Sequence, residues 1–370
     1  MRGVCARAGW GILALLLVVC APGFRANAQG MIGVPPPVYN AIDPRGVDLV
    51  TGAFNVSSQD VRIGPAGLDG LTYTRTYIGP GNGQGSGWTD NLTAMITLSA
   101  ANTIFTVSFG GSSEAFTLGG GVYSNNQGGG STLTYSSGIY TYTSSMGAVA
   151  TFSTTLASTY GPPTGGNAAR ITSMLYPDGH LLTYNYQTVS VCQTSCPGTM
   201  VSASRVQSVT NNVGYQLKLT YLSNSATTTN DLPSWTTLTN VIGLNNAYDY
   251  CSPSANTCAG PFTTTYPSAT YATNTGPPPT STTTDALNRV TTYTYSASQI
   301  TAIKAPAGET TTIVYAGPGA VSTVSNGIGT WTYTYLTVSG TPELVIVDPL
   351  SHQINTAGAT EPAGRIWTSG

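Results

Sequence analysis

The sequence carries very little charge. Only 7% of its 370 residues are Asp, Glu, Lys or Arg, whereas a typical soluble domain has about 25%. Helices with solvated faces need such residues, so this composition excludes a helix-rich intracellular enzyme. The 12 Lys and Arg residues are spread along the chain and form no basic patch, so we expect no nucleic-acid partner. Hydrophobic residues make up 40%, which is enough to build a core and argues against a disordered chain.

Long hydrophobic runs are also scarce. The apolar run from Trp10 to Ala21 is too short to cross a bilayer, and no later run reaches the roughly 18 residues that a transmembrane helix needs. Arginines precede this run, and a small-residue cleavage pattern ends at Ala28, which together predict a signal peptide over residues 1–28. A lipoprotein site at Cys20 is disfavoured because the bulky Val19 precedes it. We therefore expect export to the periplasm, the cell surface or the medium, with no transmembrane helix in the mature chain.

Beyond the predicted signal peptide four cysteines remain, in two close pairs: Cys192 with Cys196, and Cys251 with Cys258. Turn-forming residues separate the members of each pair, and in an oxidising compartment this pattern favours two local disulfides. Four cysteines allow three connectivities, so crossed pairings stay open. A tetrahedral zinc site would need further ligands nearby, and both histidines lie in other segments. We expect no metal and no cofactor.

Period-two alternation dominates the rest of the sequence. Tyrosines alternate with small polar residues at 73–77, 140–142, 184–186, 293–295 and 333–335, which places the tyrosines on one face of a strand and the polar residues on the other. Clusters of Gly, Pro and Asn separate these runs and predict turns. No long window shows helical periodicity with caps. The sequence therefore predicts an all-β fold of stacked antiparallel hairpins that form an extended or spiralling sheet.

An internal repeat runs through this pattern. A Gly or Asn is followed seven residues later by a Tyr in four places, and one more tyrosine continues the 20-residue spacing of the last two. Each unit predicts a β-hairpin with a tight turn at the Gly or Asn and a second strand that ends at the Tyr. Similar strands, at 170–174, 205–209 and 299–303, recur in this pattern. The repeat residues are Gly179 and Tyr186, Gly214 and Tyr221, Asn288 and Tyr295, Gly308 and Tyr315, and Tyr335, with Asp178 and Asp285 expected to cap their turns.

Several blocks of sequence resemble the RHS repeat, also called the YD repeat, of bacterial cell-surface and toxin proteins. Within the repeats these blocks are YPDGHLLTYNY at 176–186, TDALNRVTTYTY at 284–295 and VDPLSH at 347–352. The blocks at 47–54, 71–77 and 85–88 are similar to the segment that precedes the repeats in many RHS proteins. The resemblance covers most of the chain after the signal peptide, and it is specific because separate blocks occur in the expected order.

The resemblance divides the mature chain in two. Residues 29–165 resemble the region that precedes RHS repeats, and residues 166–370 are RHS-like repeats with two disulfide-closed loops. It implies a spiralling β ribbon that, in long members of the family, closes into a shell around a C-terminal cargo domain, often a toxin. This sequence has few repeats, ends in mid-pattern, and shows neither the closing core motif nor a cargo domain. We therefore expect a short or truncated member, or one whose partner is encoded elsewhere.

Candidate catalytic residues are few. His180 and His352 occupy the same position after an Asp-containing turn, and a residue that recurs in a repeat is better explained as part of the turn than as a base. Glycosidase carboxylates are the most serious enzymatic alternative, but the glutamates at 114, 309, 343 and 361 suggest no pair. The glycine-rich run at 81–87 does not fit a dinucleotide-binding motif and indicates a surface loop. Trp88 could stack on a sugar, although aromatic stripes in strands more often pack.

These observations predict an exported, non-enzymatic β scaffold for interaction at the cell surface or envelope. Cell-envelope polysaccharide and an effector that is C-terminal or separately encoded are the expected classes of partner. Two alternatives stay open. One is the N-terminal fragment of an RHS toxin carrier that lacks its cargo, and the other is a secreted carbohydrate-binding or glycosidase-like β protein.

Overall fold

The computed structural model describes residues 42–79, 87–99, 101–109, 112–158, 167–193, 196–258, 260–317, 319–339, 341–357 and 367–369. The predicted signal peptide lies outside the described residues, as do residues 81–86 of the predicted glycine-rich loop. Contacts between Cα atoms divide the chain into residues 1–34 and 35–370, and all described residues belong to the second unit. The boundary predicted after residue 165 falls in the undescribed stretch 159–166 and stays a prediction.

Nearly all regular structure in the described residues is β-strand, which confirms the predicted fold class. A first sheet contains β1 (Asn55–Ile63), β2 (Leu71–Ile78) and β3 (Gly87–Asp90). The remaining strands are β4 (Ala94–Leu98), β5 (Ile104–Phe109), β6 (Ser112–Gly119), β7 (Val122–Asn125), β8 (Thr132–Ser136), β9 (Ile139–Thr143), β10 (Val149–Ser153), β11 (Asn167–Leu175), β12 (Leu181–Cys192), β13 (Met200–Asn211), β14 (Tyr215–Tyr221), β15 (Leu238–Asn245), β16 (Ser268–Asn274), β17 (Thr280–Asp285), β18 (Val290–Ser296), β19 (Gln299–Lys304), β20 (Thr310–Tyr315), β21 (Val321–Ser325), β22 (Thr330–Val338), β23 (Thr341–Val347), β24 (Gln353–Ala357) and β25 (Trp367–Ser369).

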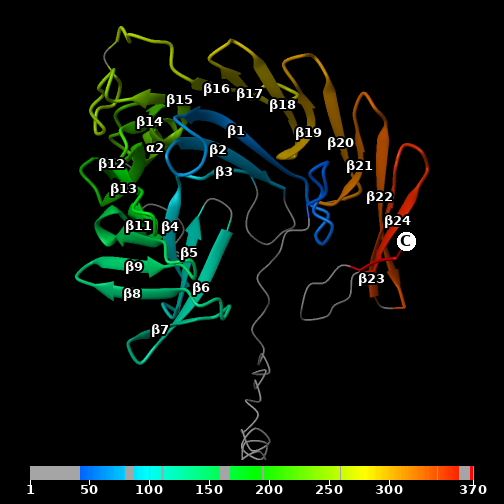
Figure 1. The fold of residues 1–370 in the computed structure, drawn as a ribbon, viewed down its shortest axis with the longest axis horizontal. Helices are drawn as coiled ribbons and strands as arrows, with labels where there is room; N and C mark the ends of the chain where they lie inside the picture. Colours follow the sequence, from blue (N-terminus) through cyan, green and yellow to red (C-terminus); the bar gives the residue numbers. More distant parts are fainter. Residues whose placement is uncertain are drawn as a thin grey trace, which may run out of the picture. The chain divides into compact units, whose positions relative to one another are not determined.

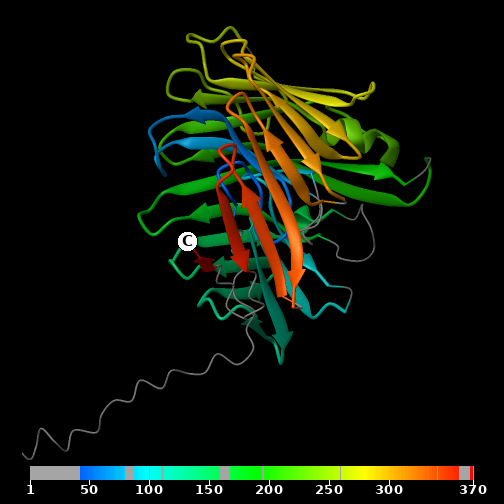
Figure 2. The same ribbon diagram turned by 90° about the vertical axis from the view of Figure 1, so that its right-hand side faces the viewer.

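These remaining strands form one long antiparallel sheet. From β8 to β25 each strand pairs with the next in the chain, and Figure 2 shows the later strands following one another in chain order from yellow to red. Strands β4–β7 branch from this ladder, because the first part of β11 pairs with β4 while its last part pairs with β12. The first sheet is separate, and its β1 and β2 pack against β14–β17 of the long sheet (Figure 1).

The Tyr–Thr alternation produces strands with one buried face. In β22 the side chains of Trp331 and Tyr333 are buried, while those of Thr330, Thr332 and Thr334 are exposed. Burial of large aromatic side chains is favourable, and the hydroxyl-bearing threonines suit a pleated, solvated face. The buried face of β18–β23 packs with Phe54 and Tyr77 of the N-terminal segment in one hydrophobic cluster.

A β-bulge recurs at the repeat tyrosines. Opposite the step into Tyr186, Tyr221, Tyr295 and Tyr315, the ladder skips one residue of the neighbouring strand. The skipped residues are Gln207, Thr239, Thr301 and Ser322. The hydroxyls of Thr239, Thr301 and Ser322 donate to the carbonyl oxygen of the residue that precedes the tyrosine, at 3.0, 3.3 and 3.1 Å. Each repeat therefore contains a bulge, which increases the local twist of the sheet.

The hairpin units differ in one respect from the sequence prediction. Gly179, Gly214 and Gly308 lie in turns with φ of +89°, +99° and +101°, where a side chain would be strained. Strands β14 and β20 end at their repeat tyrosines, as expected. Strand β12 does not end at Tyr186 but continues to Cys192, because it stays paired with β13 along that length.

In the part of the chain that the structure describes, helical structure is confined to short segments. They are η1 (Thr154–Leu156), η2 (Thr229–Asp231) and α2 (Leu232–Thr236), and α2 buries Leu232 and Trp235 against the sheet. No helix in the described parts of the chain is both long and apolar enough to cross a membrane.

Candidate functional site

Two of the repeat tyrosines, Tyr221 and Tyr315, use their hydroxyls to bind the sheet backbone. The Tyr315 hydroxyl donates to the carbonyl oxygen of Ile300 at 2.7 Å, and the Tyr221 hydroxyl donates to that of Val206 in the same way. In both cases the acceptor lies 15 residues earlier, in the preceding strand. Burial raises the pKa of both tyrosines. These side chains therefore pack and hydrogen-bond, and they stay protonated at any physiological pH.

The repeat aspartates close their turns. The Asp285 carboxylate accepts hydrogen bonds from the backbone N–H groups of Leu287 and Arg289, both at 2.9 Å. Asp348 repeats this arrangement with Leu350 and His352, at 2.9 and 2.8 Å. The backbone N–H of Arg289 is the main cause that lowers the pKa of Asp285. Such Asx turns leave these carboxylates occupied by the backbone.

Each of the two histidines pairs with the aspartate of its own turn. His352 Nδ1 lies 2.9 Å from Asp348 Oδ2. His180 lies between two carboxylates, with Nδ1 3.0 Å from Asp178 and Nε2 2.6 Å from Asp69 in the turn between β1 and β2. Its hydrogen bond with Asp178, followed in importance by that with Asp69, raises the pKa of His180. His180 therefore ties a turn of the long sheet to a turn of the first sheet, and none of its hydrogen-bond partners among the described residues is a serine or cysteine.

The cysteines form the two local disulfides, Cys192–Cys196 and Cys251–Cys258. The second disulfide closes a loop that covers β13 and β14. Pro253 in this loop accepts hydrogen bonds from Ser208 Oγ at 2.8 Å and from Lys218 Nζ at 3.0 Å, and Lys218 also donates to Ser252 at 3.2 Å. Sequence reasoning missed this contact, because nothing in the spacing indicates which strands the loop covers.

Lys218 is a buried amine held by backbone carbonyls. Its side chain is 1% exposed, and burial lowers its pKa to about 8. Ser208 is directly opposite Lys218 in the β13–β14 ladder and is also buried. A serine beside a lysine of lowered pKa has the chemistry of a nucleophile and base, but the disulfide loop covers both side chains, so no substrate reaches them.

A groove of about 470 Å³ lies where the first sheet meets β16–β18. At its base the Arg75 guanidinium is sandwiched between Trp88 and Tyr271, with its central carbon 4.4 Å from each ring centroid. Asp60 forms an ion pair with Arg75 and accepts a hydrogen bond from the Tyr271 hydroxyl at 2.9 Å. Burial alone would lower the pKa of Arg75, but the Asp60 carboxylate raises it. This cluster joins the two sheets.

The walls of the groove are aromatic and hydroxyl-rich. Trp88 Nε1 donates to the Tyr295 hydroxyl, which also hydrogen-bonds Ser281 Oγ, both at 2.7 Å. The Trp88 ring makes edge contacts with Tyr77 and Tyr293, with centroid separations of 5.6 and 5.0 Å. Trp88 is therefore packed among protein groups, as the sequence favoured, although part of it lines the groove.

Asp90 is the groove residue with the greatest potential for acid–base chemistry, and sequence reasoning missed it. Burial raises the pKa of its carboxyl group, which is the direction that a general acid requires. Asp90 accepts hydrogen bonds from the backbone of Leu92 at 2.9 Å and of Thr93 at 2.7 Å, and from the Thr93 hydroxyl at 3.1 Å. These three donors hold the carboxyl group to its own turn.

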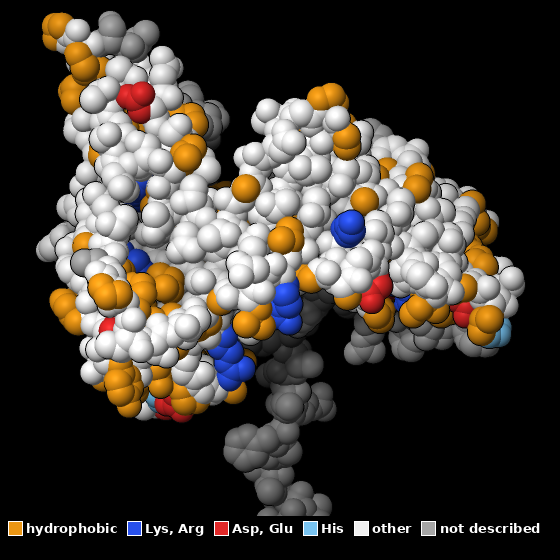
Figure 3. Space-filling view, turned by 90° about the horizontal axis from the view of Figure 1, so that it is seen from above, with side chains coloured by type: hydrophobic (Ala, Val, Ile, Leu, Met, Phe, Trp, Pro, Cys, Tyr) orange, Lys and Arg blue, Asp and Glu red, His pale blue; other side chains and the backbone are white. Residues whose placement is uncertain are grey.

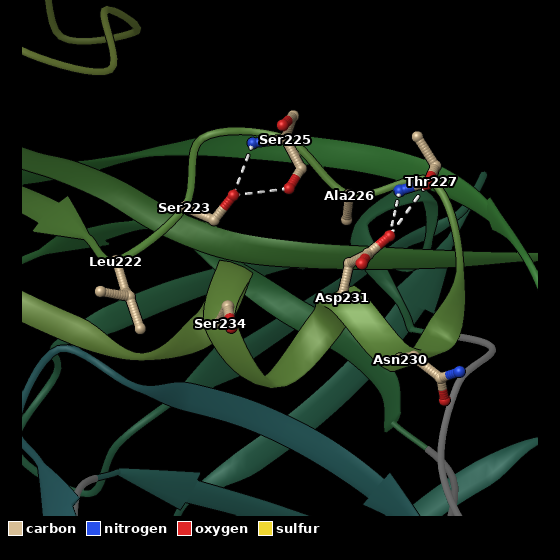
Figure 4. A pocket seen from close by; sticks show the side chains of 8 residues that line it. All are labelled: Leu222, Ser223, Ser225, Ala226, Thr227, Asn230, Asp231 and Ser234. Carbon is tan, nitrogen blue, oxygen red and sulfur yellow. Dashed lines mark hydrogen bonds between the residues drawn. The ribbon is translucent and has the colours of Figure 1, made fainter.

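A second pocket, of about 450 Å³, lies between the loop after β14 and α2 (Figure 4). Its acidic residue, Asp231, accepts hydrogen bonds from the backbone and the hydroxyl of Thr227, both at 2.9 Å. The Thr227 backbone is the main cause that lowers the pKa of Asp231 to about 2. Ser223 bonds the backbone of Ser225. These side chains shape the loop, and the pocket contains no base that could activate a serine.

The remaining predicted candidates are dispersed. Glu114, in β6, accepts hydrogen bonds from Ser131 and from the Tyr142 hydroxyl, the latter at 3.1 Å. Glu309 lies beside the Gly308 turn and Glu343 in β23, whereas Glu361 lies outside the described residues. Within the ranges that the structure describes, no three His, Cys, Asp or Glu residues are placed to hold a metal ion.

Comparisons with known proteins give distant structural matches only. No family model matches the chain, and no curated protein matches it. Among the solved structures that match are the crystal structures of TcdB2-TccC3 without its hypervariable C-terminal region and of TcdB2-TccC3-TEV. Both are 11% identical, with TM-scores of 0.35 and 0.33 over 90% and 92% of this chain. The chain spans 20% of the length of each, and a likeness at this level establishes neither family nor function.

Proposed function

We propose that this chain is an exported, non-enzymatic β scaffold of the RHS-repeat type, which acts by interaction at the cell surface or envelope. The observation that carries the proposal is how the repeat residues are used. The hydroxyls of Tyr221 and Tyr315 bind backbone carbonyls, and the turn carboxylates of Asp285 and Asp348 bind backbone N–H groups. Side chains that recur for such structural reasons support a scaffold, and two disulfides fit an oxidising compartment.

The interaction is tested with isolated envelope fractions. The purified protein, with both disulfides formed, is incubated with insoluble cell-wall polysaccharide and, separately, with envelope membranes of the source bacterium. We expect it to co-sediment with at least one fraction and to be released unchanged by denaturant. Failure to bind any fraction would contradict the proposal.

The enzymatic alternative is tested on the groove. The protein is assayed on a panel of polysaccharides for release of reducing sugar, next to Asp90→Asn and, as a matched control in the other pocket, Asp231→Asn. We expect no release by any of the three. If sugar release is lost in Asp90→Asn and kept in Asp231→Asn, the protein is a glycosidase and the scaffold proposal is wrong.

The second candidate is an RHS toxin carrier of which this chain is one part. It is favoured by the packing of residues 71–77 and 87–88 on the repeats, where the ring centroids of Trp88 and Tyr293 lie 5.0 Å apart. In a carrier these blocks would start the shell. The DNA downstream of the codon for Gly370 distinguishes the two: a reading frame that continues into more repeats and an unrelated tail favours the carrier, and a stop codon favours the short scaffold.

A further inference from the structure

The hairpin turns along one side of the long sheet end in exposed hydrophobic residues. Because successive strands from β8 to β25 are antiparallel, the turns from each odd-numbered strand to the next even-numbered strand all lie on the same side, which we call the odd–even rim. Turns normally carry Gly, Asn, Asp, Ser or Pro at their tips. Six of the eight turns from β9–β10 to β23–β24 carry a large hydrophobic residue that is 50% to 88% exposed: Met146, Val213, Tyr248 with Tyr250, Leu287, Ile328 and Leu350.

Three of these side chains are held by the same local structure. The backbone N–H groups of Leu287, Ile328 and Leu350 each donate to a side-chain oxygen two residues earlier, at 2.9 Å. The residue that accepts the bond is Asp285, Asn326 or Asp348. These Asx turns fix the backbone of the apolar residue, so the exposed side chain is presented at the tip of a rigid hairpin.

The carboxylates of Asp285 and Asp348, next to two of these tips, have side-chain partners within their own turns. Arg289 Nη2 lies 2.7 Å from Asp285, and His352 Nδ1 lies 2.9 Å from Asp348. Asn326, in the turn between β21 and β22, carries no charge. Lys304 and Glu309 flank the remaining turn in this part of the rim with opposite charges. Bringing these tips into an apolar environment therefore leaves the Asp285 carboxylate paired with Arg289 and the Asp348 carboxylate hydrogen-bonded within its turn.

The opposite side of the sheet lacks this pattern. In its turns at 275–279, 297–298 and 316–320 the described residues include no exposed large hydrophobic side chain. Leu222 is exposed in the loop after β14, and Met200 and Val338 are exposed at strand ends beside two other turns of this side, so the exposed residues there lie mostly in strands and not at turn tips. Exposed hydrophobic residues that are scattered singly need no explanation. The recurrence of such residues at the turn tips of one rim does need an explanation. Figure 3 shows hydrophobic side chains in several separate places on a surface with few charges.

We propose that the odd–even rim docks on a lipid surface and inserts Leu287, Ile328 and Leu350 between the headgroups. A protein partner would need a separate pocket for each tip, whereas the boundary of headgroups and acyl chains accepts single apolar side chains without a complementary shape. Tyr248 and Tyr250 suit the same boundary, since tyrosine has an apolar ring and a polar hydroxyl. The inference rests on the proposed function and names lipid as the envelope component that this rim binds.

The test is sedimentation with vesicles. The purified protein is mixed with vesicles of phosphatidylethanolamine and phosphatidylglycerol, and with vesicles of phosphatidylcholine alone. Because the rim has no basic cluster, we expect binding to both, with little dependence on salt. The variant Leu287→Ser/Ile328→Ser/Leu350→Ser is expected to lower the partition coefficient by about two orders of magnitude. The matched control, Met200→Ser/Leu222→Ser/Val338→Ser, removes exposed hydrophobic residues on and near the opposite rim and is expected to bind as the unchanged protein does.

Each other result overturns the proposal in a distinct way. Equal binding by both triple variants, or no binding of the unchanged protein to either vesicle, would exclude lipid docking by this rim. Concentration-dependent dimers without vesicles, lost only in the rim variant, would assign the rim to a second copy of the chain. If vesicles fail but cell-wall polysaccharide binds, the lipid inference fails and the scaffold function stands. Circular dichroism and thermal unfolding of both variants verify that they fold, which is expected because all six side chains are at least 50% exposed.

Discussion

Strands β13 and β14 are covered on both faces, whereas β22 is covered on one. In β13 seven successive residues, 203–209, are buried, and in β14 so are residues 216–219. In β22 buried and exposed residues alternate through Trp331 and Tyr333. The first sheet covers β14 on one face, and the Cys251–Cys258 loop covers the other. Alternating polar and apolar residues therefore indicate a strand that is covered on one face. Where a second layer covers the other face, it also buries the polar residues that the alternation would place in water.

The doubly covered region must satisfy polar groups that the singly covered region leaves to solvent. Lys218 donates to the carbonyls of Ser252 and Pro253. Arg205 is also buried, and it donates to the carbonyls of Ser223 and Trp235. A buried charge without such partners would be costly. The covering loops thus supply hydrogen-bond acceptors as well as apolar contact.

The largest effect is expected where the first sheet meets the long one. Arg75→Met leaves the Asp60 carboxylate buried without its cation, and we expect it to lower the free energy of unfolding by about 3–5 kcal/mol. The matched exposed pair is Arg289 with Asp285, where Arg289 is 62% exposed. Because solvent screens that pair, Arg289→Met should change stability by less than about 0.5 kcal/mol. Urea unfolding measures both.

The same comparison has an internal control. Asp60→Leu combined with Arg75→Met replaces the ion pair with apolar side chains, and it should recover much of the lost stability. If Arg75→Met and Arg289→Met have equal effects, burial between the two sheets does not make the Arg75–Asp60 pair more important for stability than the exposed pair, and the interpretation is wrong.

The next effect concerns pH. The pKa of Lys218 is about 8 in the folded chain, below its ordinary value of 10.5, so the unfolded chain binds more protons between these values. The contribution of Lys218 to the free energy of unfolding should then rise with pH across this window, by about 1–2 kcal/mol between about pH 7 and pH 9.5. Lys218→Met should remove this rise, while Lys304→Met, at an exposed site in the singly covered region, should keep it. Urea unfolding at several pH values checks the difference, and the same slope in both variants would contradict the assignment.

The smallest effect separates two tyrosines of the repeat. Tyr315 donates its hydroxyl to Ile300, so Tyr315→Phe should cost about 0.5–1.5 kcal/mol. The hydroxyl of Tyr335 is buried without a hydrogen-bond partner among the described residues, so Tyr335→Phe should be neutral or slightly stabilising. Thermal unfolding of the two variants measures the contrast. A larger loss in Tyr335→Phe would mean that its hydroxyl has a partner after all.

Much of the fold could be predicted from the sequence. Alternation predicted the strands, and the Gly or Asn seven residues before each tyrosine predicted turns that do occur, such as those at Gly214 and Gly308. The similarity between the segments 205–209 and 299–303 was visible in the sequence, but the structural reason for it was not. The central residues of these segments, Gln207 and Thr301, are bulge residues, and a bulge depends on how two strands pair, which alternation within one strand does not reveal.

The candidate sites were less predictable, because they combine residues that are far apart in the chain. Arg75 and Thr283, which share a hydrogen bond at 2.6 Å, are separated by 208 positions. Asp90 has no sequence signal beyond a common turn, and its raised pKa arises from burial. The exposed hydrophobic tips could have been found by asking which residues follow an Asp or Asn by two positions in each turn.

The sequence by itself determined the strands, their turns and the hairpin repeat, since backbone preferences and the two-residue period act over a few neighbouring positions. Only the tertiary structure decided which strands receive a second layer, which cations are buried beneath it and which turn tips share one rim. Those outcomes depend on contacts between distant segments, and the free energy of burying a side chain is set by whatever covers it.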